Sequence, residues 1–368
     1  MNSGFLYTQI YDALMEEIVT GAYKSGDILP SEKTLCEKYD VSLITVRRAL
    51  KALEDTNVIV KMKGKGSIVN ADIRKTDTTF NKNIGILDLA FSGLRNVEYP
   101  PVPFDTGIYN QNEWKNIIYS SIYNILSSKY NLILGTYDRN DIIQHFETTV
   151  FTNVQRIYVI GIYNKELIDF LHNKGKLVVV YNNFDKNLST CSVSTDERKK
   201  ASEIVDKLIK LGHRKIAAIN GDITFSESVE RAMGFQEALM KNSVPIQWPL
   251  IKWGNMSSES GYHLTKQILQ SGERPTAIVC VNDNVAAGCL FAVQEFGLKC
   301  PEDVSVIGHD NNELLHEFTK PVLTSIDPQY EIIGEKIAEK LVRNIWFDDS
   351  SIVEGQIKLR ESVSKLKV

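Results

Sequence analysis

The stretch SEKTLCEKYDVSLITVRRALKAL, residues 31–53, contains two helical patterns separated by a brief connection at Asp40 and Val41. Ser31 and Ser42 each precede one pattern, where a serine hydroxyl can accept a hydrogen bond from the free N–H groups at a helix N-terminus. Apolar residues recur at helical spacing in both patterns and predict one inner face for each helix. These inner residues are Leu35 with Cys36 or Tyr39, and Val46, Leu50 and Leu53. The stretch therefore predicts two short helices joined by a tight turn.

The segments on either side complete a small domain. On the N-terminal side, an apolar i, i+4 stripe that ends before Gly21 predicts an amphipathic helix, and its members are Leu6, Ile10, Leu14 and Ile18. On the C-terminal side, the β-branched runs VIVKM and SIVNA flank KGKG and predict a hairpin with glycines at its turn. Three helices followed by a basic hairpin predict an α+β winged helix-turn-helix domain over residues 1–71.

Basic residues are concentrated in the second half of this domain. The whole chain has a formal net charge of −4 at pH 7, which is not typical of a DNA-binding protein. Residues 42–70, however, contain six cations and two anions, whereas residues 1–41 contain three cations and seven anions. The six cations are Arg47, Arg48, Lys51, Lys61, Lys63 and Lys65. This local excess is the charge expected of a surface that contacts DNA phosphates.

From Asn83 onward, strand-like runs alternate with amphipathic helical patterns. The runs are NIGILDL, LILGTY, RIYVIG, KLVVVY, KIAAIN, TAIVCV and VSVIGH. This alternation predicts parallel sheets with helices on both faces, and about 280 residues exceed one comfortable sheet. We therefore expect an α/β domain of two lobes, each a doubly wound parallel sheet. A ligand site is expected in the cleft where the carboxyl ends of the strands face each other.

The domain boundaries follow from these patterns. Residues 72–82 are polar, lack periodicity and predict a linker. The two-lobed domain is expected over residues 83–368. Its lobe boundaries are predicted as about 83–190 and 327–347 for the first lobe, and about 191–326 and 348–368 for the second.

Composition and motifs exclude several classes of protein. Hydrophobic residues make up 43% and charged residues 24%, as in ordinary globular proteins. Neither a signal peptide nor a run of roughly 18 apolar residues is present, so we expect a cytoplasmic protein without a membrane segment. The five scattered cysteines have no metal-ligand spacing and predict reduced thiols. KGKGS fits no phosphate-binding loop, and no catalytic motif is found, so we expect no cofactor, no metal and no enzymatic activity.

Several ordered motifs connect the chain to known families. The first 70 residues resemble the DNA-binding domain of the GntR family through LYTQIYDALMEEIVTGAYKSGDILPSEKTLCEKYDVS, TVRRALKALE and GKGSIV. The C-terminal part resembles the periplasmic-binding-protein-like ligand domain of the LacI/GalR repressors through LIKLGHRKIAAING, ERAMGFQEAL, VNDNVAAG, PEDVSVIGHDNN and LTSIDPQYEIIGEKIAEKL. The match is good over about 193–345 and poor over 83–190. The combination is similar to the arabinose repressor type.

Two departures limit what the resemblance implies. Leu43 stands where the GntR pattern has an arginine directly after the serine that starts the recognition helix. FSGLRNVEYPPVPFDTGIYNQNEW stands where the LacI-like pattern runs directly from strand to helix. No base contact is therefore carried over to position 43, and no ligand contact to residues 90–115.

DNA contacts are expected from the third helix, the second helix and the hairpin. Side chains at the start of a recognition helix reach base edges in the major groove, while lysine and arginine contact phosphates. We therefore predict contacts from Ser42, Thr45, Arg47 and Arg48, with solvated surface charge as the alternative for the cations. The resemblance adds a contact from Lys33 at the start of the second helix. The residues expected at the wing tip are Lys63, Gly64, Lys65 and Gly66.

The resemblance implies five effector-binding positions. Arg231 matches the ligand arginine of the LacI-like family, Asn282 and Asp283 match its Asn-Asp pair, and Asp310 matches the acid after VIGH. Met256 falls where relatives often have an aromatic platform. Carboxylates, amides and a guanidinium suit the hydroxyls of a sugar, which both donate and accept hydrogen bonds. The structural alternatives are an ion pair for Arg231, a helix cap for Asn282 or Asp283, a turn for Asp310 and core packing for Met256.

These features predict a transcription repressor of carbohydrate-utilisation genes. A homodimer would bind two-fold related operator DNA and leave it when a small sugar closes the two lobes. The resemblance suggests L-arabinose, with L-fucose as the second candidate. A sugar-activated activator would use the same parts and stays open as an alternative. A sugar-modifying enzyme with a DNA-binding domain lacks motif support, and a structural adaptor would leave the candidate effector residues unexplained.

Overall fold

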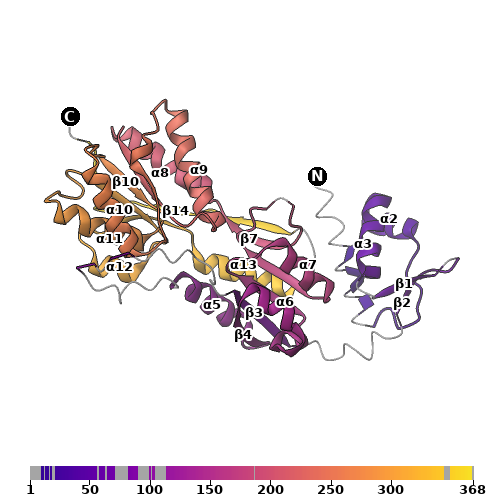
Figure 1. The fold of residues 1–368 in the computed structure, drawn as a ribbon. Coiled ribbons are helices and arrows are strands. Elements are labelled where there is room, and N and C mark those ends of the chain that lie inside the picture. The colour runs from indigo at the N-terminus through magenta and orange to yellow at the C-terminus, as the bar shows by residue number, and fades with distance from the viewer. Residues whose placement is uncertain are drawn as a thin grey trace.

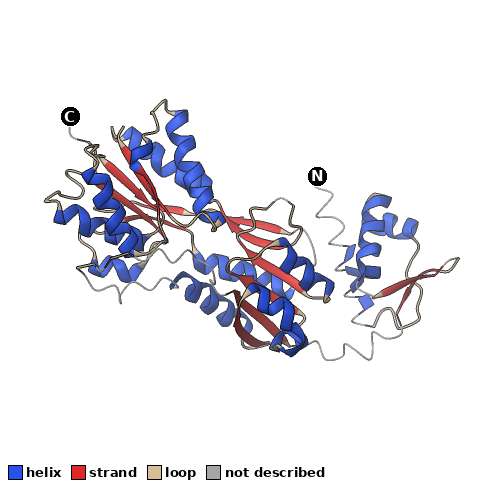
Figure 2. Ribbon diagram, in the orientation of Figure 1, coloured by secondary structure: helices blue, strands red, loops and turns tan. Residues whose placement is uncertain are grey.

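The computed structural model contains an N-terminal domain and two α/β lobes (Figure 1). The described residues are 10, 11, 13–15, 17, 18, 21–55, 58–62, 64–70, 82–89, 99, 100, 102, 103, 113–185, 187–343 and 349–366. In each lobe, helices cover both faces of a central sheet (Figure 2). The predicted fold class is confirmed. The predicted linker lies outside the described residues, apart from its last residue.

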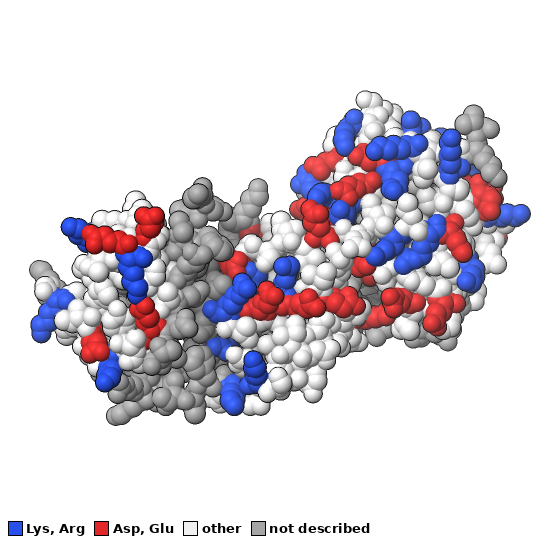
Figure 3. Space-filling model, turned by 180° about the vertical axis from the view of Figure 1, so that it is seen from behind, with Lys and Arg blue, Asp and Glu red and all other residues white. Residues whose placement is uncertain are grey.

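The N-terminal domain has the helix pair that the opening stretch predicts. Helix α2 spans Glu32–Tyr39 and helix α3 spans Leu43–Asp55. The Ser31 hydroxyl accepts a hydrogen bond from the Thr34 N–H at 3.1 Å, and the Ser42 hydroxyl accepts one from the Thr45 N–H at 3.3 Å. The predicted inner residues that the structure describes are buried or partly buried in one core, and Leu6 lies outside the described residues. On the face seen in Figure 3, cations and acids of this domain lie side by side.

A two-stranded hairpin completes the domain. Strands β1 (Ile59–Met62) and β2 (Gly66–Val69) pair antiparallel. Gly64 and Gly66 have φ values of 84° and 98°, which allow the tight turn between the strands. The predicted wing is therefore present, and its tip is exposed to solvent.

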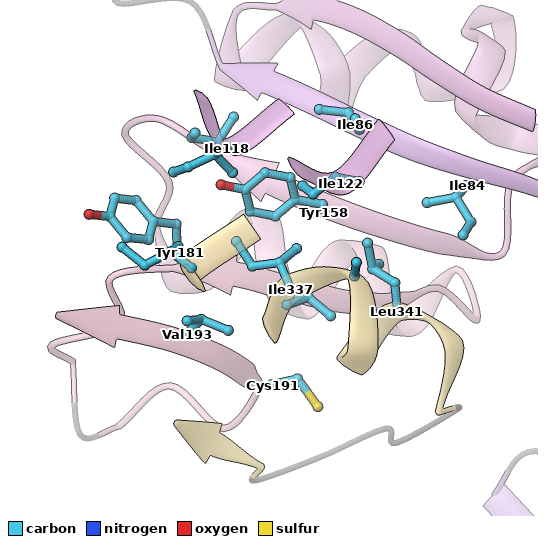
Figure 4. Close-up of a cluster of buried hydrophobic side chains, with 14 of the residues drawn as sticks. Ile84, Ile86, Ile118, Ile122, Tyr158, Tyr181, Cys191, Val193, Ile337 and Leu341 are labelled. Atoms are coloured by element: carbon cyan, nitrogen blue, oxygen red, sulfur yellow. The ribbon is translucent and has the colours of Figure 1, made fainter. Parts of the chain in front are cut away.

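The first lobe contains a six-stranded parallel sheet. Its strands are β3 (Asn83–Leu89), β4 (Asn131–Tyr137), β5 (Arg156–Ile160), β6 (Leu177–Tyr181), β7 (Cys191–Thr195) and β13 (Ser350–Val353), in the spatial order β13-β7-β6-β5-β3-β4. Its helices are α5 (Glu113–Leu126), α6 (Arg139–His145), α7 (Lys165–Asn173) and α13 (Tyr330–Val342), with short 3-10 turns at Phe146–Thr148 and Val150–Asn153. Ile118, Ile122, Ile337 and Leu341 of α5 and α13 pack against Ile86 and Tyr158 of the sheet (Figure 4).

The second lobe contains another six-stranded sheet, with one antiparallel edge strand. Its strands are β8 (Ile216–Asn220), β9 (Ile251–Trp253), β10 (Ala277–Cys280), β11 (Ser305–His309), β12 (Thr324–Asp327) and β14 (Gln356–Lys358), in the order β14-β12-β11-β10-β8-β9. Its helices are α8 (Glu197–Lys210), α9 (Ser226–Lys241), α10 (Ser258–Gln270), α11 (Asp283–Glu295) and α12 (Glu313–Phe318), with a 3-10 turn at Trp248–Leu250. Strand β14 pairs antiparallel with β12, so this sheet is mixed.

The chain crosses between the lobes three times, at residue 196, at residues 328–329 and at residues 354–355. The crossovers are hydrogen-bonded to one another. The Gly355 N–H donates to Asp196 Oδ1 at 2.8 Å, and the Gln329 side-chain amide donates to the Glu354 carbonyl oxygen at 2.5 Å. This arrangement joins the lobes through three neighbouring backbone segments.

Two predicted lobe boundaries are wrong. Strand β7, which was expected in the second lobe, pairs parallel with β6 of the first. Strand β13, expected in the second lobe with residues 348–368, pairs parallel with β7. The chain leaves the first sheet only after these strands have paired. Their short segments CSVST and SSIV lack the long apolar run of the central strands, so their pairing was not predicted.

Helices α10 and α11 approach each other closely through glycines. A Cβ atom at Gly288 would lie 1.9 Å from the Ser258 carbonyl oxygen, and one at Gly261 would lie 2.2 Å from the Val285 carbonyl oxygen. Contacts this short with backbone atoms cannot be relieved by a side-chain rotation. Glycine at both positions therefore permits the close helix spacing that places the N-terminus of α11 beside the cleft.

We expect Gly288→Ala to lower the free energy of unfolding by about 1–3 kcal/mol, because the added methyl group forces the two helices apart. Urea unfolding followed by circular dichroism measures this change. The matched control is Gln294→Ala, an exposed position on the same helix, which should have little effect. Equal stabilities of the glycine variant and wild type would contradict the close packing.

Candidate functional site

A cavity of about 330 Å³ lies between the two lobes. Its volume is in the range of small-molecule sites. It is lined at the carboxyl ends of strands from both sheets, where the sequence predicts a ligand site. The lining residues are Trp114, Gly161, Ile162, Tyr163, Tyr181, Asn182, Asn183, Phe184, Asp185, Thr224, Phe225, Ser226, Glu227, Arg231, Asn255, Met256, Asn282, Asp310 and Tyr330.

Arg231 is held in one orientation at this cavity. Its Nε donates to Glu197 Oε2 at 2.7 Å, and its NH1 donates to the Val281 carbonyl oxygen at 2.6 Å. Its NH2 lies 3.9 Å from Asp310 Oδ1. The guanidinium is thus fixed from three directions, by α8, by the end of β10 and by the end of β11. A planar group fixed in this way can present hydrogen-bond donors to a ligand in a defined direction.

His309 joins the two carboxylates into one network. Its Nε2 lies 2.9 Å from Glu197 Oε2, and its Nδ1 lies 2.9 Å from Asp310 Oδ1. The hydroxyl of Tyr330, which belongs to the first lobe, donates to Asp310 Oδ1 at 2.8 Å. The network therefore connects the two lobes as well as the strands of the second.

The charges of this network support one another. Burial alone would raise the pKa of Glu197, but the Arg231 guanidinium and the His309 ring hold that pKa well below its usual value. Burial would lower the pKa of Arg231, but the Glu197 and Asp310 carboxylates raise it. Burial and Arg231 lower the pKa of His309, and Glu197 and Asp310 more than offset them and raise it. Charged forms of the arginine and of Glu197 are therefore favoured.

Asn282 and Asp283 have different surroundings although they are adjacent. Asn282 lines the cavity, caps α11 by accepting a hydrogen bond from the Val285 N–H at 2.8 Å, and donates to the Met256 carbonyl oxygen at 3.1 Å. Asp283 is buried and does not line this cavity. Its two carboxylate oxygens accept hydrogen bonds from the Ser325 hydroxyl at 2.7 Å and the Asn312 N–H at 2.8 Å. Asp283 thus supports the loop that follows β11, and the capping alternative applies to Asn282.

Aromatic side chains form much of the wall on the side of the first lobe. The Trp114 ring lies 5.7 Å from the Tyr181 ring and 5.8 Å from the Tyr330 ring, centroid to centroid. Met256 lines the cavity from the second lobe with a φ of 66°. Aromatic rings of this kind can pack against the C–H face of a sugar or against a planar ring.

Sequence reasoning missed several residues that line the cavity. Asn182 of the first lobe donates to Glu227 Oε1 of the second at 3.1 Å, so these two side chains bridge the lobes. Burial raises the pKa of Glu227. Glu197 and His309, which position Arg231 and Asp310, were missed as well. The only local signal was the place of Asn182 and His309 at the ends of apolar strands, which does not reveal their partners.

The predicted DNA-contacting residues lie on the N-terminal domain. Lys33, Arg48 and the described wing-tip residues Gly64, Lys65 and Gly66 are exposed. Arg47 is 61% exposed, and its Nε donates to Glu32 Oε2 at 2.8 Å. Thr45 is buried, and its hydroxyl lies 2.8 Å from the Ser42 hydroxyl. Lys63 lies outside the described residues.

The buried Asp283 generates a pH prediction. Burial, followed by the neighbouring Asp310 charge, raises the pKa of Asp283 to about 7. The folded protein therefore binds one more proton than the unfolded chain between about pH 4 and pH 7, and its stability falls as the pH rises through that window. The free energy of unfolding should therefore decrease between pH 5 and pH 8. We expect this decrease to be smaller by roughly 2–3 kcal/mol in Asp283→Asn than in wild type.

Urea unfolding at the two pH values measures this difference. Glu302→Gln, which changes an exposed carboxylate of the same lobe, serves as the control and should behave like wild type. The same pH dependence of unfolding in Asp283→Asn and wild type would refute the raised pKa of Asp283.

Known proteins resemble large parts of this chain. The chain is 32% identical over 184 residues to the HTH-type transcriptional repressor PurR of Vibrio atlanticus (strain LGP32), covering 48% of this chain and 55% of that protein. The chain spans about half the length of the curated relatives it matches. A solved structure of the transcription regulator CcpA of Lactococcus lactis is similar with a TM-score of 0.61 and 26% identity, over 77% of this chain and 99% of that one.

A LacI family transcriptional regulator from Enterococcus faecium, solved with bound ribose, has the same fold. Its TM-score is 0.61 and its identity 24%, over 77% of this chain and 100% of that one. Among the described residues, no helix is long and apolar enough to cross a membrane, and no group of three or more His, Cys, Asp or Glu side chains is placed to hold a metal ion.

Two family models match separate parts of the chain. Residues 6–69 match the bacterial regulatory proteins of the gntR family, and residues 205–364 match the periplasmic binding protein-like domain. Both matches agree with the resemblances found in the sequence motifs. The chain therefore combines a helix-turn-helix domain that matches the gntR family with a periplasmic binding protein-like domain similar to that of known transcriptional repressors.

Proposed function

We propose that this protein is a cytoplasmic transcription repressor, without enzymatic activity, that is released from operator DNA by a small neutral sugar. The observation that carries the proposal is the fixed Arg231 guanidinium beside Asp310 in an aromatic-walled cavity between two lobes. The genes it controls would serve carbohydrate utilisation. The relatives named as transcriptional regulators, one of them with bound ribose, support this function.

The charge of the cavity favours a neutral ligand. Arg231 is the one Lys, Arg or His among the described lining residues, and Glu197 already pairs with it. The lining also includes Asp185, Glu227 and Asp310. An anionic ligand would meet these acids without a free cation to compensate. A neutral sugar, by contrast, can use its hydroxyls as donors to carboxylates and as acceptors from amides and Arg231.

A planar heterocyclic base is the second candidate ligand, because the Trp114, Tyr181 and Tyr330 rings would also accommodate a flat ring. The sugar remains the first candidate, since its hydroxyl groups can donate to Asp185, Glu227 and Asp310 and accept from Arg231 in the same cavity. L-Arabinose and L-fucose are the sugars to test first.

Ligand binding would change how the lobes sit on their three crossovers. The Asn182–Glu227 and Tyr330–Asp310 hydrogen bonds cross from one lobe to the other, at 3.1 and 2.8 Å. A ligand that contacts the same side chains shifts the balance between lobe orientations by its difference in affinity for them. In a homodimer, this shift alters the separation of the two DNA-binding domains and the fit to paired half-sites. An activator would use the same coupling with the opposite sign.

We expect L-arabinose, L-fucose or another neutral monosaccharide to raise the melting temperature of the full chain, because it binds only the folded cleft. Ribose 5-phosphate and adenine, tested beside them, probe the anionic and planar alternatives. Arg231→Ala and the near-isosteric Asp310→Asn should each weaken sugar binding at least about tenfold. Calorimetric titration measures the affinity.

Arg198→Ala, on an exposed arginine of α8, is the matched control and should bind sugar like wild type. Circular dichroism verifies that each variant is folded. A chain that is indifferent to every neutral sugar, or whose DNA affinity is unchanged by a bound sugar, would overturn the proposed mechanism. A rise in DNA affinity on sugar binding would identify a sugar-dependent binder instead of a released repressor.

We expect Lys65→Ala and Arg47→Ala to weaken binding to duplexes selected from a random DNA pool, because each removes a cation from the DNA-facing surface. Each substitution should also reduce the slope of log affinity against log salt by about one. Fluorescence anisotropy at several salt concentrations gives both quantities. Lys38→Ala, whose amine pairs with Glu17, is the control. Salt slopes equal to that of wild type in both variants would contradict the phosphate contacts.

A further inference from the structure

The N-terminal end of α3 exposes two large apolar side chains. Leu43 is 41% exposed and Ile44 is 79% exposed. The other apolar side chains of α3 behave differently, because they are buried in the core of the domain or packed against it. These are Val46, Ala49, Leu50, Ala52 and Leu53. Leu43 and Ile44 therefore contribute little to the folded domain, and their exposure costs solvation free energy that a partner could recover.

The polar side chains beside them are already engaged. The Ser42 hydroxyl accepts from the Thr45 N–H at 3.3 Å and lies 2.8 Å from the Thr45 hydroxyl. Thr45 is only 6% exposed. Thr45 thus serves the helix cap rather than an outside partner, contrary to its predicted place at the DNA surface. The exposed side chains of the first turn of α3, Leu43 and Ile44, are consequently both apolar.

The surroundings of this apolar face are basic. Arg47 and Arg48 follow one turn further along α3, and both are exposed. Lys33 is exposed at the start of α2, and Lys61 of the hairpin reaches Glu32, the same acid that pairs with Arg47. An apolar helix start that is followed by exposed arginines on the same helix fits a polyanion that carries apolar groups between its charges. Duplex DNA has this chemistry in its major groove, where the thymine C5-methyl is the apolar group on the base edges.

We propose that Leu43 and Ile44 are specificity-determining residues that recognise thymine methyl groups in the major groove. This inference rests on the proposed DNA-binding function and specifies which bases are read. Neighbouring residues on a helix point about 100° apart, so the two side chains address adjacent base steps rather than one. Each operator half-site accordingly contains A·T pairs under the start of α3, at the position where an arginine would select guanine.

The experiment uses the full chain and duplexes selected by it from a random pool. In a selected half-site, each thymine is replaced in turn by deoxyuridine, which removes only the C5-methyl group. At the thymines under α3, we expect each replacement to weaken binding about fourfold, as for loss of one buried methyl group. At flanking thymines, the same replacement should have no effect.

Variants of the protein assign the effect to these side chains. In Ile44→Ala, an exposed substitution that should leave the fold intact, the difference between thymine and deoxyuridine should disappear at one position. Leu43→Ala should abolish it at the neighbouring position. Lys65→Ala, which weakens binding through the wing, should retain the full difference at both.

The outcomes separate this inference from the function on which it rests. Tight selective binding with equal affinity for thymine and deoxyuridine, or selected half-sites without A·T pairs under α3, would overturn methyl recognition and leave the repressor intact. A methyl effect that persists unchanged in both α3 variants would overturn the assignment to Leu43 and Ile44. Failure to select any duplex would refute DNA binding itself, and the inference with it.

Discussion

The buried ion pair between Arg231 and Glu197 is the interaction on which the cleft depends. Glu197 is the first residue of α8, directly after the first crossover, and its side chain is 1% exposed. Its carboxylate also meets His309, and Arg231 reaches the end of β10 through the Val281 carbonyl oxygen. Forming a buried pair costs desolvation free energy. Removing one partner then leaves a buried charge uncompensated and destabilises a protein by about 3–5 kcal/mol. Such a pair at the wall of a cavity fits the proposed role of Arg231, which is to present fixed hydrogen-bond donors to a ligand.

The same network would connect a ligand in the cavity to the relative orientation of the lobes. Asp310 receives hydrogen-bonding partners from both lobes, because His309 belongs to the second lobe and the Tyr330 hydroxyl to the first. The crossovers are close in sequence to residues of this network. Strand β7 leads into α8, which begins with Glu197, and β12 leads into α13, which begins with Tyr330. A change in the hydrogen bonds of the cavity therefore acts close to the segments about which the lobes can move. In the proposed homodimer, coupling to DNA would require only that two lobe orientations differ in the spacing of the DNA-binding domains.

The N-terminal domain is expected to bind its partner through exposed charges rather than through a buried network. Its contacts with DNA are expected to rest on exposed cations, whose surface ion pairs, such as Arg47 with Glu32, contribute little to stability and can be exchanged for phosphates. In the proposed complex with DNA, affinity and register would come from charge, while Leu43 and Ile44 would provide an apolar selectivity that charge cannot. Under these proposals, specificity for bases and specificity for the ligand belong to separate domains.

Local sequence patterns determined the elements, and tertiary structure determined the site. The caps at Ser31 and Ser42, the hairpin glycines and the seven predicted strand runs depend on contacts within a few residues, so the sequence alone predicted them. Strand β13 was assigned to the wrong lobe because its partner β7 is about 160 positions away in the sequence, and β7 because its short segment lacks the apolar run of the central strands. The roles of Asn282 and Asp283 were left open, and only the structure separated a cavity-lining cap from a buried support. The partners of Arg231 come from α8, β10 and β11, and side chains from distant segments acquire their charges and directions only when folding brings them together.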